Sequence, residues 1–495
     1  METITSIKPL LAVLVSSGAS LLLLYFRRNP NRREACSIVA SVITFLIVIS
    51  MAPVVLAGGV VEQTIFKILP GINLAFKVDG VGLLFATTSS FLWVVATVYT
   101  IGYMRTLKEG HQTRFYIYFA ISVSAAIGVA FSANLFTLYT FYEILSLATF
   151  PLVIHKETRE SWDAGRKYLL YLAGSSKTIL LGAVVLTYLL TGTLEFNRAG
   201  MFSDGGAKTL LTVIYFCYLF GFAKAAVMPM HSWLPAAMVA PTPVSALLHA
   251  VAVVNVGTFS IVRVVLDVFG VDLMLKLDLG TYTAIFASIT ILAASAYALA
   301  QDNLKMRLAY STVSQLSYIV LGMALLSVHG MTGGIIHIVN HAFSKITLFF
   351  CAGAIYSVSH KTNISQLSGI ARKMPWTIAA FGIGSLSLIG VPLFAGFISK
   401  WNLALGTIET KNWVLLGVLL TSSVLNMAYF APIVYKAVFE PLPVDHGGHG
   451  GHGEHEDFGE APLTILVPLL VTSVGTVILG VYPDFFLRLI EVRLL

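Results

Sequence analysis

The sequence predicts an all-α polytopic membrane protein with about fourteen transmembrane helices. Only 11% of the 495 residues are charged, whereas a soluble domain carries roughly 25%. Hydrophobic residues make up 57% of the chain. They occur in runs of about 20, the length that spans a hydrocarbon core of about 30 Å. A chain of this composition could not cover its surface with polar groups, so a water-soluble enzyme is excluded.

Apolar runs bounded by charged residues or by Gly and Pro define the predicted spans. The N-terminal run continues to Phe26 and lacks the basic start and small-residue cleavage site of a signal peptide. We therefore expect it to form a full-length span. In chain order, the predicted spans are 8–26, 36–58, 79–103, 115–131, 134–154, 167–191, 209–228, 242–266, 281–299, 306–328, 331–357, 376–407 with an internal break, 412–438 and 461–487.

Basic residues predict the orientation. The net charge of +7 would suggest nucleic acid in a soluble protein, but Lys and Arg of membrane proteins gather in cytoplasmic loops. The loops after odd-numbered spans carry seventeen Lys and Arg residues, and the opposite side, termini included, carries ten. We therefore expect a cell-membrane protein with both termini facing outward and no nucleic-acid partner. Four further lysines fall inside predicted spans: Lys177, Lys224, Lys345 and Lys400.

One low-complexity stretch, HGGHGGHGEHEDFGE at residues 446–460, carries four histidines alternating with glycine. Such a segment could bind a transition metal or buffer protons. A glycine-rich chain is too flexible to hold a preformed metal site, which favours a solvated cytoplasmic loop. The three cysteines lie far apart in apolar stretches without metal-ligand spacing, so we expect no metal site.

Charges inside the spans are the strongest functional signal, because one charge at mid-bilayer costs about 2.5 to 3.5 kcal/mol. Glu143 lies midway along the fifth span, in FTLYTFYEILSLATFPLVIH, and needs a cationic partner. Lys224, in FCYLFGFAKAAVMPMHSWLP, precedes Pro229 and Pro235, which open a helix. A broken helix at membrane depth is tolerated beside protein or a water-filled cavity. About fifteen apolar or small residues precede Lys224, which weakens the alternative of an interfacial lysine.

His337, His341 and Lys345, in GGIIHIVNHAFSKITLFF, are spaced four residues apart. They therefore share one helical face over about 12 Å. A single histidine is often a satisfied core residue, but three aligned titratable groups in a membrane helix favour a proton relay with intervening water.

Lys400 follows a second predicted interruption, in GSLSLIGVPLFAGFISKW, where Gly390, Pro392 and Gly396 break the helix. The spans of Lys224 and Lys400 lie five apart, and each combines a break with a buried ammonium. This correspondence is expected of two five-helix inverted repeats.

Lys177, His249 and Asn255 each permit two interpretations. Lys177, central in the sixth span, either joins the same chain or compensates a neighbouring carboxylate. His249 and Asn255 share the eighth span, in PVSALLHAVAVVNVG, and either hydrogen-bond within the bundle or continue the relay. The group Asp302, Lys305 and Arg307 is most simply a charged loop at the start of the tenth span, and Asp79 is a helix cap.

Several long stretches resemble the antiporter-like proton-conducting subunits of respiratory complex I, of Mrp-type multisubunit sodium/proton antiporters and of membrane-bound group 4 hydrogenases. FYEILSLATFPLVIHKET is most similar to the branch that holds the D-type Mrp subunits and the hydrogenase subunits. The resemblance extends from about the third span to the last. The stretches are FGFAKAAVMPMHSWLPAAMVAPTPVSALLHA, AQDNLKMRLAYSTVSQLSYI, HIVNHAFSKITLFFCAGAI and LIGVPLFAGFISKWNL.

This resemblance implies fourteen helices, inverted repeats formed by helices 4–8 and 9–13 with helices 7 and 12 broken, and a hydrated polar axis. It implies that Glu143 and Lys224 form a functional pair, that the His337 to Lys345 face is the central connection, and that Lys400 is the far-side terminal residue. The family often has a second lysine in the eighth span, in a pattern like MVKAG, where this chain reads VVNVG with Asn255. The path then passes Asn255 through water, Lys177 substitutes, or the pump is altered.

These observations predict a proton-translocating subunit that works beside other membrane subunits of an Mrp-, hydrogenase- or complex I-like assembly. The open alternatives are a sodium/proton antiporter module, the energy-coupling subunit of a redox enzyme and, with less support, a module coupled to inorganic-carbon uptake. No flavin, cluster, quinone or nucleotide motif is present, so we expect no cofactor and no redox chemistry in this chain. The expected parts are helices 1–3 at 1–114, a first repeat at 115–270, a second at 280–438, the His/Gly-rich loop at 439–460 and a last helix at 461–495.

Overall fold

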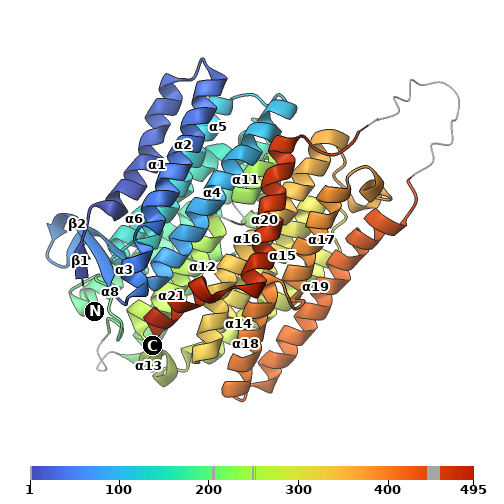
Figure 1. The fold of residues 1–495 in the computed structure, drawn as a ribbon. Coiled ribbons are helices and arrows are strands. Elements are labelled where there is room, and N and C mark those ends of the chain that lie inside the picture. The colour runs from blue at the N-terminus through green and yellow to red at the C-terminus, as the bar shows by residue number, and fades with distance from the viewer. Residues whose placement is uncertain (1–2, 203–206, 248–249, 251, 443–457, 495) are drawn as a thin grey trace, which may run out of the picture.

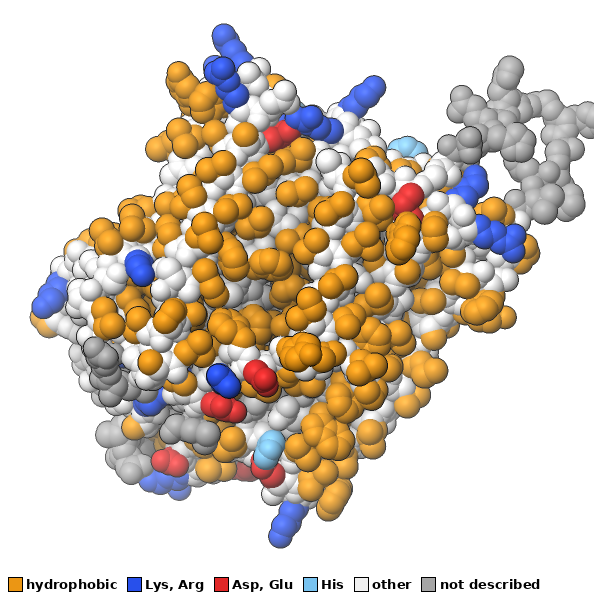
Figure 2. All heavy atoms as spheres, in the orientation of Figure 1, with side chains coloured by type: hydrophobic (Ala, Val, Ile, Leu, Met, Phe, Trp, Pro, Cys, Tyr) orange, Lys and Arg blue, Asp and Glu red, His pale blue; other side chains and the backbone are white. Residues whose placement is uncertain are grey.

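The computed structural model describes residues 3–202, 207–247, 250, 252–442 and 458–494. The chain is mostly helical, and long helices pack side by side as a bundle, with α1 (Lys8–Tyr25) and α2 (Pro30–Ile49) at one edge and α19 (Trp413–Phe439) at the other (Figure 1). Hydrophobic side chains dominate the face in Figure 2, whereas Lys, Arg, Asp and Glu lie mostly toward its upper and lower ends. This distribution is that of a protein surrounded by hydrocarbon.

Within the described residues, ten helices are long and apolar enough to cross a membrane. The other predicted spans coincide with helices that are shorter, more polar or interrupted. The ten are α1 (Lys8–Tyr25), α2 with α3 (Pro30–Leu56), α4 (Gly80–Thr106), α5 (Gln112–Ala130), α6 (Leu135–Val153), α7 to α8 (Arg159–Thr191), α14 (Leu279–Leu299), α16 (Val328–Ser359), α19 (Trp413–Phe439) and α20 (Leu463–Val481).

Both predicted interruptions are present. α9 (Lys208–Gly221) ends before Lys224, and the described residues between it and α12 (Val253–Arg263) form only short helical turns. α17 (Pro375–Ile389) ends at Gly390, whose φ of 96° lies in the left-handed region that glycine adopts without strain. α18 (Ala395–Glu409) then carries Lys400.

The long helix α16 occupies the centre of the bundle. All of its apolar window is buried, compared with one third for α1. A membrane helix that is covered on every side lies among other helices rather than against lipid. The face that carries His337, His341 and Lys345 is therefore placed in the protein interior, against α15 (Leu304–Ala324) and α18.

A three-stranded sheet at one end departs from the all-α expectation. β2 (Val60–Leu69) and β3 (Ile72–Val78) form an antiparallel hairpin, and β1 (Thr3–Thr5) pairs with β2 in parallel. The hairpin turns at Pro70 and Gly71 between two runs rich in β-branched and aromatic residues, which is a hairpin signature. A Cβ at Gly71 would lie 2.6 Å from the Gly192 carbonyl oxygen, so the turn packs directly on the end of α8 (Leu181–Thr191).

The last predicted span also differs from the structure. The helix predicted over 461–487 ends at Val481, and a separate helix, α21 (Asp484–Leu494), begins after Tyr482 and Pro483. Proline lacks the N–H that a continuing helix requires, and it disfavours helical geometry at the residue before it. The chain therefore changes direction there.

Candidate functional site

Lys224 lies at the break after α9, with its ammonium against α6. Nζ donates hydrogen bonds to the Tyr142 carbonyl oxygen at 2.9 Å and to Ser146 Oγ at 2.6 Å. It also lies 3.1 Å from the centre of the Tyr142 ring. The side chain is fully buried. One helix therefore supplies the ammonium with a carbonyl, a hydroxyl and an aromatic face.

Close packing of α12 positions this break. A Cβ at Gly257 would lie 2.1 Å from the Ala225 backbone nitrogen and 2.4 Å from the Lys224 carbonyl carbon. Trp233 Nε1 donates to the Ala223 carbonyl oxygen at 3.0 Å, which satisfies one acceptor that the broken helix exposes. The residue at 257 must therefore lack a side chain for the Lys224 segment to adopt this path.

Glu143 follows Tyr142 on α6, but its carboxylate does not touch Lys224. Among the described residues, no hydrogen bond or ion pair within 4 Å joins these two side chains, and both Glu143 oxygens are buried without a hydrogen-bond partner. The two groups are still near enough to interact electrostatically. The predicted pair is therefore separated by more than a salt-bridge distance in this structure.

Lys345, on α16, has surroundings of the same kind. Its Nζ donates to Ser311 Oγ at 2.6 Å and to the Leu308 carbonyl oxygen at 3.4 Å, both on α15. It lies 5.8 Å from the centre of the Phe430 ring on α19. The side chain is fully buried, so this ammonium too is held by neutral groups.

Lys400 is the third example, at the second break. Its Nζ donates to the Ile389 carbonyl oxygen at 2.8 Å and to Ser423 Oγ at 3.1 Å, and it lies 5.2 Å from the centre of the Tyr318 ring. The carbonyl is the last of α17, which the break leaves without an intrahelical partner. Unlike Lys224 and Lys345, Lys400 is only half-buried.

We call this arrangement of a main-chain carbonyl, a serine hydroxyl and an aromatic ring a lysine cradle. None of the three cradled lysines has a carboxylate within 4 Å in the described part of the chain. Sequence reasoning identified the lysines but missed the groups that hold them. A serine inside an apolar span is too common to signal such a role, because it usually bonds to its own helix. The serines are Ser146, Ser311 and Ser423.

The predicted histidine ladder shares α16 with Lys345 and reaches the Lys400 cradle at His337. The rings of His337 and His341 lie 6.1 Å apart between their centres, and both side chains are fully buried. His337 Nδ1 is 2.8 Å from Ser399 Oγ, the residue before Lys400. The Tyr318 ring, which faces Lys400, also contacts His337 edge-on at 5.5 Å. The structure thus brings His337, His341 and Lys345 toward Lys400.

The remaining predicted residues are placed differently. Asn255 is buried, its Nδ2 donates to the Ala250 carbonyl oxygen at 2.6 Å, and its Oδ1 has no partner in the described residues. His249 lies outside the described residues, as does most of the His/Gly-rich segment. Lys177 is exposed on the outer face of its helix, and the structure therefore does not bring it to the buried lysines.

Sequence reasoning missed a cluster of paired charges near the C-terminus. Asp79 caps α4 as predicted, accepting from the Gly82 amide at 2.9 Å. It also receives two hydrogen bonds from Arg263, at 2.6 and 2.7 Å. Arg263 contacts Asp267 at 3.1 Å, and Arg493 of α21 pairs with Asp267. We call this group of four residues the outer cluster: Asp79, Arg263, Asp267 and Arg493. Its members come from parts of the chain that are far apart in the sequence, so no local sequence pattern predicts that they meet.

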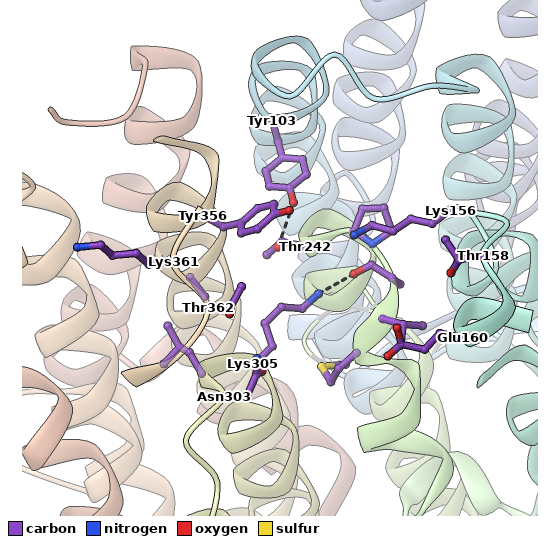
Figure 3. A pocket seen from close by; sticks show the side chains of 16 residues that line it. Tyr103, Lys156, Thr158, Glu160, Thr242, Asn303, Lys305, Tyr356, Lys361 and Thr362 are labelled. Atoms are coloured by element: carbon purple, nitrogen blue, oxygen red, sulfur yellow. Dashed lines mark hydrogen bonds between the residues drawn. The ribbon is translucent and has the colours of Figure 1, made fainter. Parts of the chain in front are cut away.

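A cavity of about 340 Å³ opens at the end of the bundle that carries the basic loops (Figure 3). Lys305 donates to the Ala240 carbonyl oxygen at 2.6 Å there, whereas the Lys361 side chain points away from the cavity. Lys305 lies on α15. The same helix supplies Leu308 and Ser311, one and two turns further on, to the cradle of Lys345. The labelled lining residues are Tyr103, Lys156, Thr158, Glu160, Thr242, Asn303, Lys305, Tyr356, Lys361 and Thr362.

The neighbouring charged loop is structural, as predicted. Asp302 accepts hydrogen bonds from the Ser365 amide at 3.0 Å and hydroxyl at 2.7 Å, and these bonds hold the pKa of its carboxyl below the usual value. Arg307 donates to the Gln301 and Leu299 carbonyl oxygens at the end of α14. These contacts fix the loop that leads into α15.

Residues 132–426 match the family described as NADH:quinone oxidoreductase/Mrp antiporter, transmembrane. The chain is 33% identical to the N subunit of the NADH-quinone oxidoreductase of Desulforudis audaxviator over 80% of this chain and 79% of that one. It is 33% identical to the A subunit of the Na(+)/H(+) antiporter of Alkalihalophilus pseudofirmus over 73% of this chain and 46% of that one. It is 32% identical to hydrogenase-4 component B of Escherichia coli over 66% and 50%. The chain therefore spans only about half of these last two relatives.

Solved structures share the fold over nearly the whole chain. A chain of the Mrp complex from Dietzia sp. DQ12-45-1b superposes with a TM-score of 0.86 at 23% identity, covering 99% of this chain and 97% of that one. A chain of the membrane-bound sulfane sulfur reductase, an archaeal respiratory membrane complex, gives 0.84 at 23% identity, covering 98% and 97%. Both neighbours are chains of multisubunit membrane complexes. The protein is an antiporter-like membrane subunit that belongs to the NADH:quinone oxidoreductase/Mrp antiporter family.

Proposed function

We propose that the chain translocates protons through its interior as one subunit of a multisubunit membrane complex. The observation that carries this proposal is the set of three lysines in neutral cradles, two of them fully buried and the third half-buried. A structural charge at membrane depth is normally neutralised by an opposite charge. Neutral partners satisfy the hydrogen bonds of the ammonium. Because no carboxylate holds the charge in place, the proton can still be transferred.

The proposed route begins at Glu143 and Lys224. An approaching carboxylate favours the charged form of an amine, so a change in their separation alters how tightly Lys224 holds its proton. The proton then passes by His249 and water held near Asn255 to the ladder of Lys345, His341 and His337. Contact of His337 with Ser399 supports Lys400 as the terminal residue for exchange with one side of the membrane.

The proposed architecture has fourteen spans with two inverted five-helix repeats, helices 4–8 and 9–13. The matching breaks before Lys224 and Lys400, and their matching cradles, support this repeat. We place the chain in the cell membrane with both termini outside, because the basic loops lie together at one end. The division into 1–114, 115–270, 280–438, 439–460 and 461–495 follows from this arrangement.

A second candidate differs in what drives the chain. In an Mrp-type assembly it exchanges sodium and protons on an existing gradient. In a hydrogenase- or complex I-like assembly it couples a redox reaction of other subunits to proton movement. Relatives named for each kind of assembly support both. Purification of the native complex and identification of its chains separates them, because hydrogenase-like large and small subunits support redox coupling and small Mrp-type subunits alone support exchange.

Substitution of the first pair tests proton translocation directly. In membrane vesicles containing the complete complex, we expect Lys224→Ala and Glu143→Ala to abolish pumping while the subunits still assemble. The matched control is Lys208→Ala, because Lys208 is an exposed lysine at the start of the helix that precedes Lys224. Unchanged pumping by an assembled Lys224→Ala complex would overturn the proposal.

A further inference from the structure

Lys177 occupies an unusual position for a charged side chain. It lies in the π-helical turn η2 (Ser176–Leu180), which follows a second π-helical turn, η1 (Leu170–Gly174), in the long helix between α7 and α8. The apolar part of this helix runs from about residue 168 to 191. At 1.5 Å per residue, Lys177 lies about 14 Å from one end and 21 Å from the other, close to the middle of the membrane.

The Lys177 side chain points out of the subunit. It is exposed, and within the described residues it forms no hydrogen bond or ion pair. Apart from Thr178, the exposed residues around it are apolar: Leu170, Leu181, Val185 and Leu189. An ammonium in such surroundings would face hydrocarbon, where a charge is costly and therefore rare unless it is paired.

The surface beside Lys177 on the same helix is shaped for close approach of another helix. Around the Cβ positions of Gly174 and Gly182 there is open space, and the exposed Thr178 lies midway between them. Its hydroxyl donates to the Gly174 carbonyl oxygen at 2.7 Å, so it needs no further partner. Small residues every four positions let transmembrane helices pack closely, and π-helical turns inside helices are frequent at functional sites.

We infer that this face docks a transmembrane helix of another subunit, and that a carboxylate of that helix pairs with Lys177. Charge complementarity selects the partner's chemistry. The phosphates of anionic lipids lie at the membrane surface, too far from Lys177 to pair with it. A second copy of this chain would have to offer Glu143, whose oxygens are buried inside its own fold. The remaining candidate for the partner of Lys177 is an Asp or Glu at mid-membrane depth in a different subunit.

The inference leads beyond the proposed proton route, because it concerns assembly and holds whichever ion the complex moves. It also assigns Lys177 a partner outside the chain, in place of a role in the relay between Lys224 and Lys345. The two proposals can fail independently. Docking through Lys177 is measured as association between subunits, whereas proton translocation is measured as flux.

The test uses the complete complex in its native membrane. We expect Lys177→Met to reduce the amount of the neighbouring subunit that co-purifies by at least about fivefold, whereas Lys177→Arg, which keeps the charge, retains it. The control is Lys208→Met, which removes an exposed lysine near the membrane surface. Because Lys177 forms no hydrogen bond or ion pair among the described residues of its own chain, the Lys177→Met chain should still insert into the membrane at the wild-type level.

A photoreactive residue at position 178 identifies the partner. We expect a crosslink to a peptide of another subunit that has Asp or Glu inside an apolar span. In a charge swap, replacement of that Asp or Glu by Lys should allow the partner subunit to associate again with the Lys177→Glu chain. Full association of Lys177→Met, a crosslink to lipid alone, or a crosslink to a second copy of this chain would each overturn the inference.

Discussion

The outer cluster and the lysine cradles are two ways to bury charge in one bundle. In the outer cluster, each guanidinium contacts a carboxylate, and Arg263 binds Asp79 through two hydrogen bonds. In the cradles, the ammonium groups of Lys224, Lys345 and Lys400 contact carbonyl and hydroxyl oxygens instead. Paired charges gain by staying together, whereas a charge held by neutral groups can lose its proton without leaving a partner uncompensated. The difference separates structural charge from charge available for transport.

The largest expected effect is the loss of transport in Lys345→Met. Lys345 is fully buried at the centre of the bundle, and methionine fills a similar volume but cannot carry a proton. We expect the initial rate of proton flux in vesicles to fall more than tenfold, with the thermal midpoint of the purified complex unchanged or higher, because an unpaired buried charge has been removed.

Lys361→Met is the matched control, since that side chain points away from the cavity (Figure 3). A Lys345→Met complex that pumps at half the wild-type rate or better would show that a cradled lysine is dispensable. A large fall in thermal midpoint would instead place Lys345 with the structural charges.

The outer cluster should give the opposite result. Arg493→Met leaves a buried carboxylate of Asp267 with one partner fewer, and breaking a buried pair costs about 3 kcal/mol. We expect a lower thermal midpoint with proton flux per folded complex retained. Arg488→Met, an exposed position on the same helix, is the control. Loss of flux at an unchanged midpoint would contradict a structural role for the cluster.

Serine substitutions compare the cradles with one another. A hydrogen bond to a charged group is worth about 1.5 to 3 kcal/mol when buried, and each 1.4 kcal/mol is tenfold in an equilibrium. We expect Ser146→Ala and Ser311→Ala to slow proton flux about tenfold. Ser423→Ala should slow it only about twofold, because its bond to Lys400 is longer, at 3.1 Å, and Lys400 is only half-buried. Equal effects at all three serines would show that burial does not set the strength of a cradle.

The smallest effect concerns His155, which lies just beyond α6 and outside the membrane-spanning part. Burial, with a smaller contribution from the charge of Arg114, lowers the pKa of His155 to about 4. The unfolded chain takes up this proton near pH 6.5, so below that pH the unfolded state binds more protons. Stability therefore falls as the pH drops from about 6.5 toward 4, by about 2 kcal/mol at pH 5.

His155→Gln should reduce the difference between thermal midpoints at pH 7 and pH 5, whereas His111→Gln, at an exposed histidine nearby, should not. This measurement distinguishes a loss of folded protein at low pH from a direct effect of pH on proton flux through the cradled lysines. An unchanged pH dependence in His155→Gln would assign the acid sensitivity to another group.

Sequence patterns predicted the features that depend on local periodicity and composition. The helical character, the breaks before Lys224 and Lys400, the shared face of His337 and Lys345, and the cap at Asp79 all follow from spacing or from the backbone chemistry of Gly and Pro. The roles of these residues in proton translocation stay predictions until flux is measured.

The β2–β3 hairpin was not predicted, because its two short strands lie between the predicted apolar spans 36–58 and 79–103. The seventh span was predicted with its break near Lys224, but the eighth was predicted as one helix over 242–266, whereas its described residues form the separate helices α11 (Thr242–Ala246) and α12. The tight approach of Gly257 to the Lys224 segment had no signal at all, because a glycine in an apolar run is usually only a small residue.

By itself, the sequence determined which residues are charged at membrane depth and which of them share a helix face. Only the tertiary structure decided what each charge meets: serines for Lys224, Lys345 and Lys400, carboxylates for Arg263 and Arg493, and the outside of the subunit for Lys177. The physical reason is that periodicity fixes the direction of a side chain relative to its own helix axis. The neighbour that covers that direction is set by packing between segments far apart in the chain.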